Sequence, residues 1–150
     1  MKQSPDIVDL DKILRTSPLV AGGFMGDDPR SVTEVIDTDA GTLFVLGVTA
    51  KQIAARMRQI TDMAAQALGT WTDIDARRQA MVDEVRGALP CSWPHAGDYF
   101  KRVTTLQRTD SGQTIRWSDL NIHMIAAHGF FEGRGSTFRT EPAELVAALF

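Results

Sequence analysis

The sequence predicts an α+β fold, with helices at both ends of the chain and a small antiparallel sheet, built from hairpins, between them. Three observations lead to this prediction. Residues 50–68 place apolar side chains at helical spacing behind a capping signal. Two β-prone runs, 99–108 and 113–117, flank a turn that contains Gly112. Helix-starting residues then recur near the C-terminus, and a chain of 150 residues fits a single domain spanning 1–150.

The N-terminal third is expected to be helical. Residues 1–20 predict an arm that docks on the domain through a short helix, because four apolar residues follow helical spacing: Ile7, Leu10, Ile13 and Leu14. Residues 31–48 have two interpretations. Their apolar spacing favours two short helices interrupted at Gly41, whereas their β-branched residues also suit a hairpin. We favour the helices.

The helix at 50–68 has the clearest boundaries. Gly47 suits the left-handed residue that ends a preceding helix. Thr49 is an N-cap residue, and Gln52 three positions later completes a capping box. Gly69 closes the helix.

The middle of the chain predicts extended structure. Residues 70–74 are predicted to be extended. The rest of 70–89 suits either a helix or a strand that pairs with 70–74 as a hairpin. Prolines and glycine predict a loop over 90–98. The hairpin of 99–108 and 113–117 comes next.

The C-terminal segment predicts two helices. Ser118 caps a helix over 119–128, which ends at Gly129. A short strand is expected at 137–139. Pro142 then starts a final helix over 143–149.

Composition excludes several classes of protein. Hydrophobic residues are 43% and charged residues 23%, and the longest apolar run is too short to span a bilayer. The N-terminus lacks the apolar core of a secretory signal, and Cys91 is the single cysteine, so a reducing, cytoplasmic location is expected. The net charge of −3 includes only a mild basic excess near the C-terminus, which argues against duplex DNA as a partner.

The loop 129–139 is the favoured candidate site. A phosphate or carboxylate could be bound here by Arg134 and Arg139, together with Ser136 and the backbone N–H groups that the loop's glycines leave accessible. His123 follows Asp119 by four residues on a helix, so the carboxylate could orient the imidazole and let pH tune the contact. These residues predict a small binding or interaction module without a cofactor; a binding role is favoured over catalysis, and whether the protein is an enzyme stays open. Its partner would be a small anionic ligand or a protein, and a homo-oligomer stays open.

A first alternative is a zinc-binding protein or a metal-dependent hydrolase. Cys91 and His95, then His123 and His128, supply the thiolate and imidazole donors that zinc prefers. On a regular helix, however, residues five apart lie about 140° from each other, so both histidines could face one ion only if the helix end unwound. We therefore expect His128 to point into the core and His123 to point toward solvent.

A second alternative is a hairpin that binds single-stranded RNA or DNA. Single strands are bound by basic side chains mixed with aromatic side chains on which bases stack. The predicted hairpin and its ends carry such a mixture: Tyr99, Phe100, Lys101, Arg102, Arg108, Arg116 and Trp117.

Overall fold

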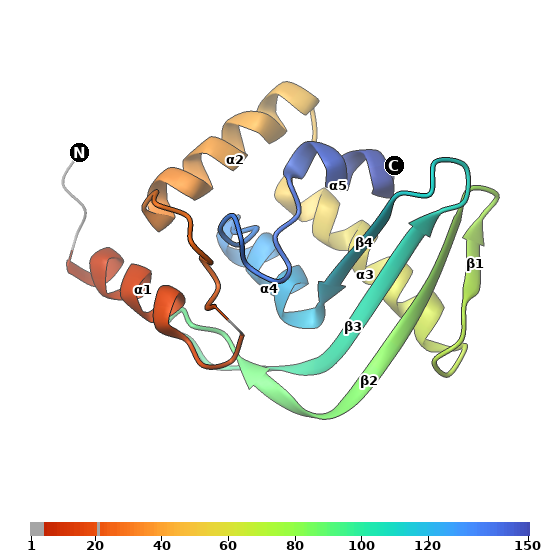
Figure 1. The fold of residues 1–150 in the computed structure, drawn as a ribbon, viewed down its shortest axis with the longest axis horizontal. Coiled ribbons are helices and arrows are strands. Elements are labelled where there is room, and N and C mark those ends of the chain that lie inside the picture. Colours follow the sequence, from red (N-terminus) through yellow and green to blue (C-terminus); the bar gives the residue numbers. More distant parts are fainter. Residues whose placement is uncertain (1–4, 21) are drawn as a thin grey trace.

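The computed structural model describes residues 5–20 and 22–150, and it confirms the α+β prediction (Figure 1). The elements, in chain order, are α1 (Pro5–Thr16), α2 (Val32–Leu46), α3 (Ala50–Ala65), β1 (Thr72–Asp75), β2 (Arg78–Pro90), β3 (Asp98–Arg108), β4 (Thr114–Ser118), α4 (Asp119–His128) and α5 (Pro142–Leu149). The strands form one sheet in the order β1-β2-β3-β4, and every neighbouring pair is antiparallel. No helix among the described residues combines the length and the apolar character that crossing a membrane requires.

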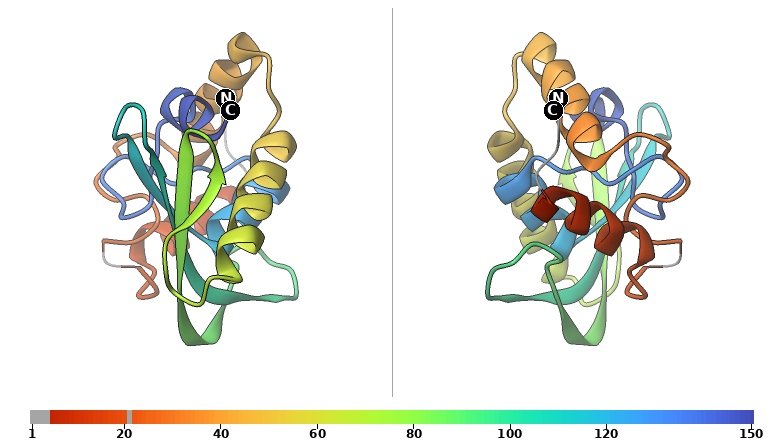
Figure 2. Two further views of the ribbon diagram at one scale, coloured as in Figure 1. Left: turned by 90° about the vertical axis from the view of Figure 1, so that its right-hand side faces the viewer. Right: turned by 90° about the vertical axis from the view of Figure 1, so that its left-hand side faces the viewer.

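The first core lies between the sheet and the helices that cover one of its faces, as the side views in Figure 2 show. Helix α3 contributes the fully buried Ile53, Met57 and Ile60. The sheet contributes Trp117 and Leu106, and α5 closes the cluster with the side chains of its last turns. The indole nitrogen of Trp117 donates to the hydroxyl of Thr61, so the one polar atom of this large side chain is also satisfied.

A second core joins α1, α2 and α4 to the loop segments beside them. It contains the buried residues Leu10, Leu14, Phe24, Met25, Val32, Val35, Cys91, Leu120, Met124 and Phe130. The docked helix predicted for the N-terminal arm is confirmed from residue 5 onward, because Leu10 and Leu14 are buried. Ile13 is half exposed, and both residues 1–4 and the side chain of Ile7 lie outside the described residues. Helix α4 lies between the two cores and contributes to both.

The predicted caps at Thr49, Ser118 and Gly129 are confirmed, whereas the prediction that Gly69 closes α3 is wrong, because α3 ends at Ala65 with Gln66 as its C-cap. The side chain of Thr49 accepts a bond from the backbone of Gln52, whose own side chain accepts from the backbone of Thr49. Ser118 and Asn121 form the same arrangement at the start of α4. Gly129 ends α4 with a φ of 63°, and its N–H bonds to the carbonyl of Ile125.

Residues 31–48 differ from both interpretations, because α2 is one uninterrupted helix. Ser31 caps it, and Gly47 ends it with a φ of 74°. Gly41 weakens an exposed helix interior by about 0.5–1 kcal/mol. Burial of Val32, Val35 and Leu43 against the two cores offsets that cost. The prediction of two short helices is therefore wrong.

Residues 70–89 form the hairpin of β1 and β2, which resolves that ambiguity. The predicted strand at 137–139 is wrong. This segment forms turns in which the N–H of Arg139 bonds to the carbonyl of Ser136. The side chain of Arg139 points into the protein instead of lying along a sheet.

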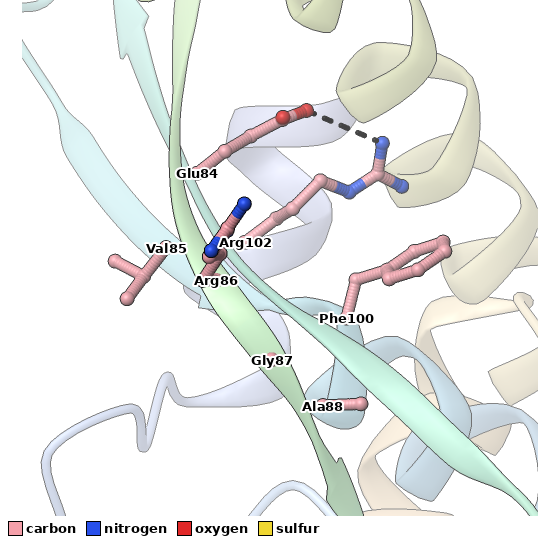
Figure 3. Close-up of a pocket in the computed structure, with 7 residues that line it drawn as sticks. All are labelled: Glu84, Val85, Arg86, Gly87, Ala88, Phe100 and Arg102. Atoms are coloured by element: carbon pink, nitrogen blue, oxygen red, sulfur yellow. Dashed lines mark ion pairs between the residues drawn. The ribbon is translucent and has the colours of Figure 1, made fainter.

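Strands β2 and β3 extend beyond their neighbours and bend, so their connecting loop reaches α1 and α4 (Figure 1). The register shifts at the bend: Val85 is opposite Lys101, whereas Ala88 is opposite Phe100. The two extra residues in β2 include Gly87, whose φ of 110° is accessible to few other residues. Figure 3 shows this bend, where Val85 points away from the side that carries Glu84 and Phe100. The bend carries loop 91–97 toward the C-terminal end of α4.

Candidate metal centre

Four potential metal ligands meet where loop 91–97 lies against α4. Cys91 and His95 come from the loop, and His123 and His128 come from the helix. Each offers one donor atom, and the four atoms lie within 4.8 Å of one another. Cys91 is buried, His123 and His128 are half-buried, and His95 is exposed. The cluster is therefore close to the surface, with the thiol at its inner side.

Three of the six separations between donor atoms are close to the edges of a tetrahedron around zinc, and all six are within 4.8 Å. The Nε2 atom of His95 lies 3.0 Å from Nε2 of His123 and 3.3 Å from Nε2 of His128. The sulfur of Cys91 lies 3.6 Å from Nε2 of His128. With Zn–N bonds of about 2.0–2.1 Å and a Zn–S bond of about 2.3 Å, tetrahedral geometry places two nitrogens about 3.3–3.4 Å apart and a nitrogen and a sulfur about 3.6 Å apart. The 3.3 and 3.6 Å separations agree with this geometry, whereas the 3.0 Å separation is shorter and equals the length of a hydrogen bond between two imidazole nitrogens.

A backbone carbonyl orients the imidazole of His95. Its Nδ1 atom lies 2.9 Å from the carbonyl oxygen of Ala96, which can only accept a hydrogen bond. The ring proton therefore belongs on Nδ1, and Nε2 carries a lone pair directed at the other donors. Metal-ligating histidines commonly make this second hydrogen bond, which fixes both the tautomer and the ring orientation.

Aromatic rings hold the other two imidazoles in place. Trp93 stacks on His128 with ring centroids 4.1 Å apart and ring planes 5° from parallel. Tyr99 stacks on His123 with centroids 4.1 Å apart. Stacking limits rotation of each imidazole about its side-chain bonds. The site is thus preorganised by two residues that do not themselves supply ligands.

The local electrostatics favour neutral imidazoles. Burial, and then the neighbouring His123 and His95, lower the pKa of His128 to about 4. Burial and the proximity of His95 also lower the pKa of His123. Burial raises the pKa of the Cys91 thiol, although backbone N–H groups of Trp93 and Ser92 partly counteract this by donating to the sulfur. A cation would replace the thiol proton, because metals bind the thiolate and the neutral imidazole.

The expectation that His123 and His128 point in different directions is wrong. Helix α4 stays regular through His128, so it does not unwind, yet the centroids of the two rings lie only 5.3 Å apart. The separation of about 140° applies to the positions of the two residues around the helix axis and not to the atoms at the ends of their side chains. An imidazole reaches far enough from the backbone to curve around the helix, and His128 is half-buried against Trp93 instead of inside the core.

Asp119 does not orient His123, contrary to the sequence prediction. Its carboxylate is buried and bonds to Arg102, with Nε at 3.0 Å and Nη2 at 2.9 Å. Arg58 lies 3.3 Å from the same oxygen. Asp119 therefore ties α4 to α3 and β3, and the imidazole of His123 is oriented by Tyr99.

The predicted anion-accepting loop is largely occupied by contacts within the protein. The side chain of Arg139 is 5% exposed and bonds to Asp39 at 2.5 and 3.0 Å and to Glu141 at 3.0 Å. Ser136 is buried, and its hydroxyl lies near the carboxyl group of Glu132. Arg134 is exposed and lies 3.3 Å from Glu141. An anion would have to compete with these carboxylates, and the anion site stays a prediction.

The residues of the predicted nucleic-acid hairpin are also divided. Trp117 is buried in the first core, and Tyr99 covers His123. Phe100 is 68% exposed on the inner side of the bend, with the guanidinium of Arg102 5.6 Å from its ring centroid (Figure 3). One exposed aromatic ring offers less stacking surface than the sequence predicted, and the interaction stays a prediction.

Comparisons with protein families, with curated proteins and with solved structures find no match for this chain. The functional proposal therefore depends on the donor atoms of Cys91, His95, His123 and His128. Of the site residues predicted from the sequence, the structure brings together the metal ligands of the first alternative. The two residues that sequence reasoning did not assign to that site are Trp93 and Tyr99.

Proposed function

We propose that the protein binds one Zn²⁺ ion through Cys91, His95, His123 and His128. The observation that carries the proposal is the convergence of one sulfur and three imidazole nitrogens within 4.8 Å. These donors come from segments about thirty residues apart in the sequence. The ion would fasten loop 91–97, and with it the bent end of the β2–β3 hairpin, to α4.

The donor set favours zinc. Thiolate and imidazole ligands suit zinc, and zinc imposes no geometry of its own beyond packing four ligands around the ion. Two of the donor separations, 3.3 and 3.6 Å, also agree with the edges of a tetrahedron.

A structural role is favoured over hydrolysis. Structural zinc sites use four protein ligands, whereas catalytic sites keep one position open for water or substrate. Here four side chains would fill the shell of such an ion, and the three imidazole rings among them are also packed or hydrogen-bonded. The metal-dependent hydrolase is therefore the weaker form of the zinc alternative.

Cobalt substitution and metal analysis test the proposal. Purified protein should contain about one zinc per chain, and Co²⁺ should give the intense visible absorption of a tetrahedral ion with a thiolate-to-metal charge-transfer band. Cys91→Ala and His123→Ala should each lose the charge-transfer band or the stoichiometric metal. Asp98→Ala changes an exposed residue beside the loop that supplies no ligand, so it serves as the matched control.

The outcomes are separable. Metal content near zero in a folded wild-type protein would remove the proposal. Metal that persists unchanged in both ligand variants would place the binding site elsewhere. An octahedral cobalt spectrum with no charge-transfer band would show that the sulfur is not a ligand.

A further inference from the structure

Helix α2 carries large apolar side chains on the side that faces away from the rest of the chain. Val32, Val35 and Leu43 are buried against the two cores. Phe44 is 88% exposed and Val45 is 84% exposed. At 100° per residue, the exposed pair lies across the helix from the buried residues. Phe44 and Val45 thus place two large apolar side chains at the C-terminal end of a side that is otherwise polar.

Gly41 lies on the same open side of α2 without any local reason to be glycine. Its backbone is ordinary helix, and a Cβ atom added there would meet nothing within 4 Å. Glycine inside a helix is unfavourable because the unfolded chain loses more conformational freedom. The missing side chain leaves a notch one turn before Phe44, and such a notch lets another helix approach closely.

We propose that the open side of α2 is the interface of a homodimer, in which α2 packs antiparallel against α2 of a second copy. A two-fold axis between residues 42 and 43 would place Phe44 of each copy over Gly41 of the other. The knob and the notch thus lie on one helix at the spacing that a self-complementary contact needs.

Charge selects the antiparallel arrangement. Glu34 and Asp37 are exposed on the N-terminal half of the same side of α2. A parallel pair would bring these carboxylates of the two copies face to face. The antiparallel pair separates them and moves them toward the other copy's α2–α3 turn, where Lys51 is exposed and the positive amino end of α3 lies.

The surface beside α2 extends this apolar contact. A groove of about 280 Å³ runs along the helix between Ile36, Phe44 and Val48. A second, of about 680 Å³, lies on the other side of Val48 and reaches Phe150, which is 55% exposed. A stable interface needs about 800 Å² from each partner, more than one helix side supplies. The α2–α3 turn and Phe150 would therefore belong to the interface.

Sedimentation equilibrium of the full, metal-loaded chain tests the inference, with protein from about 1 µM to about 500 µM. Wild type should show a concentration-dependent monomer–dimer equilibrium. Gly41→Leu fills the notch, and Phe44→Asp removes the knob, so each should raise the dimer dissociation constant by on the order of 100-fold. The control is Phe100→Asp, which changes an exposed aromatic residue on β3 and should leave the dissociation constant unchanged.

Gly41→Leu also separates interface from folding. Leucine is the better helix former, so the variant should melt at the same or a higher temperature than wild type when both are dilute. Raised melting temperature with lost dimerisation is the expected combination. A chain that remains monomeric throughout the concentration range overturns the proposal. A dimer that neither substitution weakens overturns it as well.

Discussion

Replacing Arg139 with methionine is expected to destabilise the protein by about 3–5 kcal/mol, the cost of leaving one buried charge without its partner. The side chains of Arg139 and Asp39 are only 5% and 3% exposed and make two bonds, at 2.5 and 3.0 Å. Arg139 also donates to the carbonyl of Glu132. Methionine keeps most of the volume, so the predicted loss comes from the charge and the hydrogen bonds and not from a cavity.

Urea unfolding followed by circular dichroism at pH 7 measures this loss. The double variant Arg139→Met, Asp39→Leu should recover most of it, because it removes the orphaned carboxylate as well. Arg134→Met is the matched control, since Arg134 is 63% exposed and its pair with Glu141 should contribute less than about 1 kcal/mol.

A loss below about 1 kcal/mol for Arg139→Met, or a double variant no more stable than the single one, would refute this reasoning. Either result would also favour the predicted anion site in loop 129–139, because it would mean that Arg139 is available for a ligand. A large loss would assign Arg139 to the fold.

Three further predictions follow from the buried groups and the metal centre. Burial raises the pKa of Glu132 from 4.5 to about 7, so its stabilising contribution is complete below the unfolded pKa and is lost as pH rises through 7. Unfolding free energy should therefore fall by about 3 kcal/mol over this window relative to Glu132→Gln, and parallel pH curves for the two proteins would contradict it. Trp93→Ala should weaken zinc affinity by about 10–100-fold in a chelator competition, whereas Trp93→Phe should retain most of it; equal affinities would show that the stack on His128 is incidental. Chelation should lower unfolding free energy by about 2.7 kcal/mol relative to free zinc at one hundred times its dissociation constant, and an unchanged denaturation midpoint would contradict zinc binding to the folded state.

Capping and turn residues predicted the elements whose boundaries depend on residues close to them in the sequence. The Thr49–Gln52 capping box starts α3, and Ser118 and Gly129 bound α4. The turn at Gly112 joins β3 to β4. Each signal depends on backbone bonds within a few residues, so no knowledge of the tertiary structure is needed.

Tertiary contacts decided what local signals could not. Gly41 suggested a break in α2, but burial of residues on either side keeps the helix continuous. The metal ligands were identified by residue type, whereas their convergence depends on the bulge at Gly87, which carries loop 91–97 to α4. The bulge and the direction that a side chain takes depend on packing against residues far away in the sequence. The spacing of residues along one helix contains no information about these contacts.

The central claim is that one sulfur and three imidazole nitrogens bind zinc together, and zinc K-edge X-ray absorption of the purified protein tests it most directly. We predict a first shell of one Zn–S bond at about 2.3 Å and three Zn–N bonds at about 2.0–2.1 Å, with the outer-shell scattering of imidazole rings. A first shell of oxygen and nitrogen alone, or a sample without stoichiometric zinc, would contradict the assignment of Cys91, His95, His123 and His128 as the metal centre.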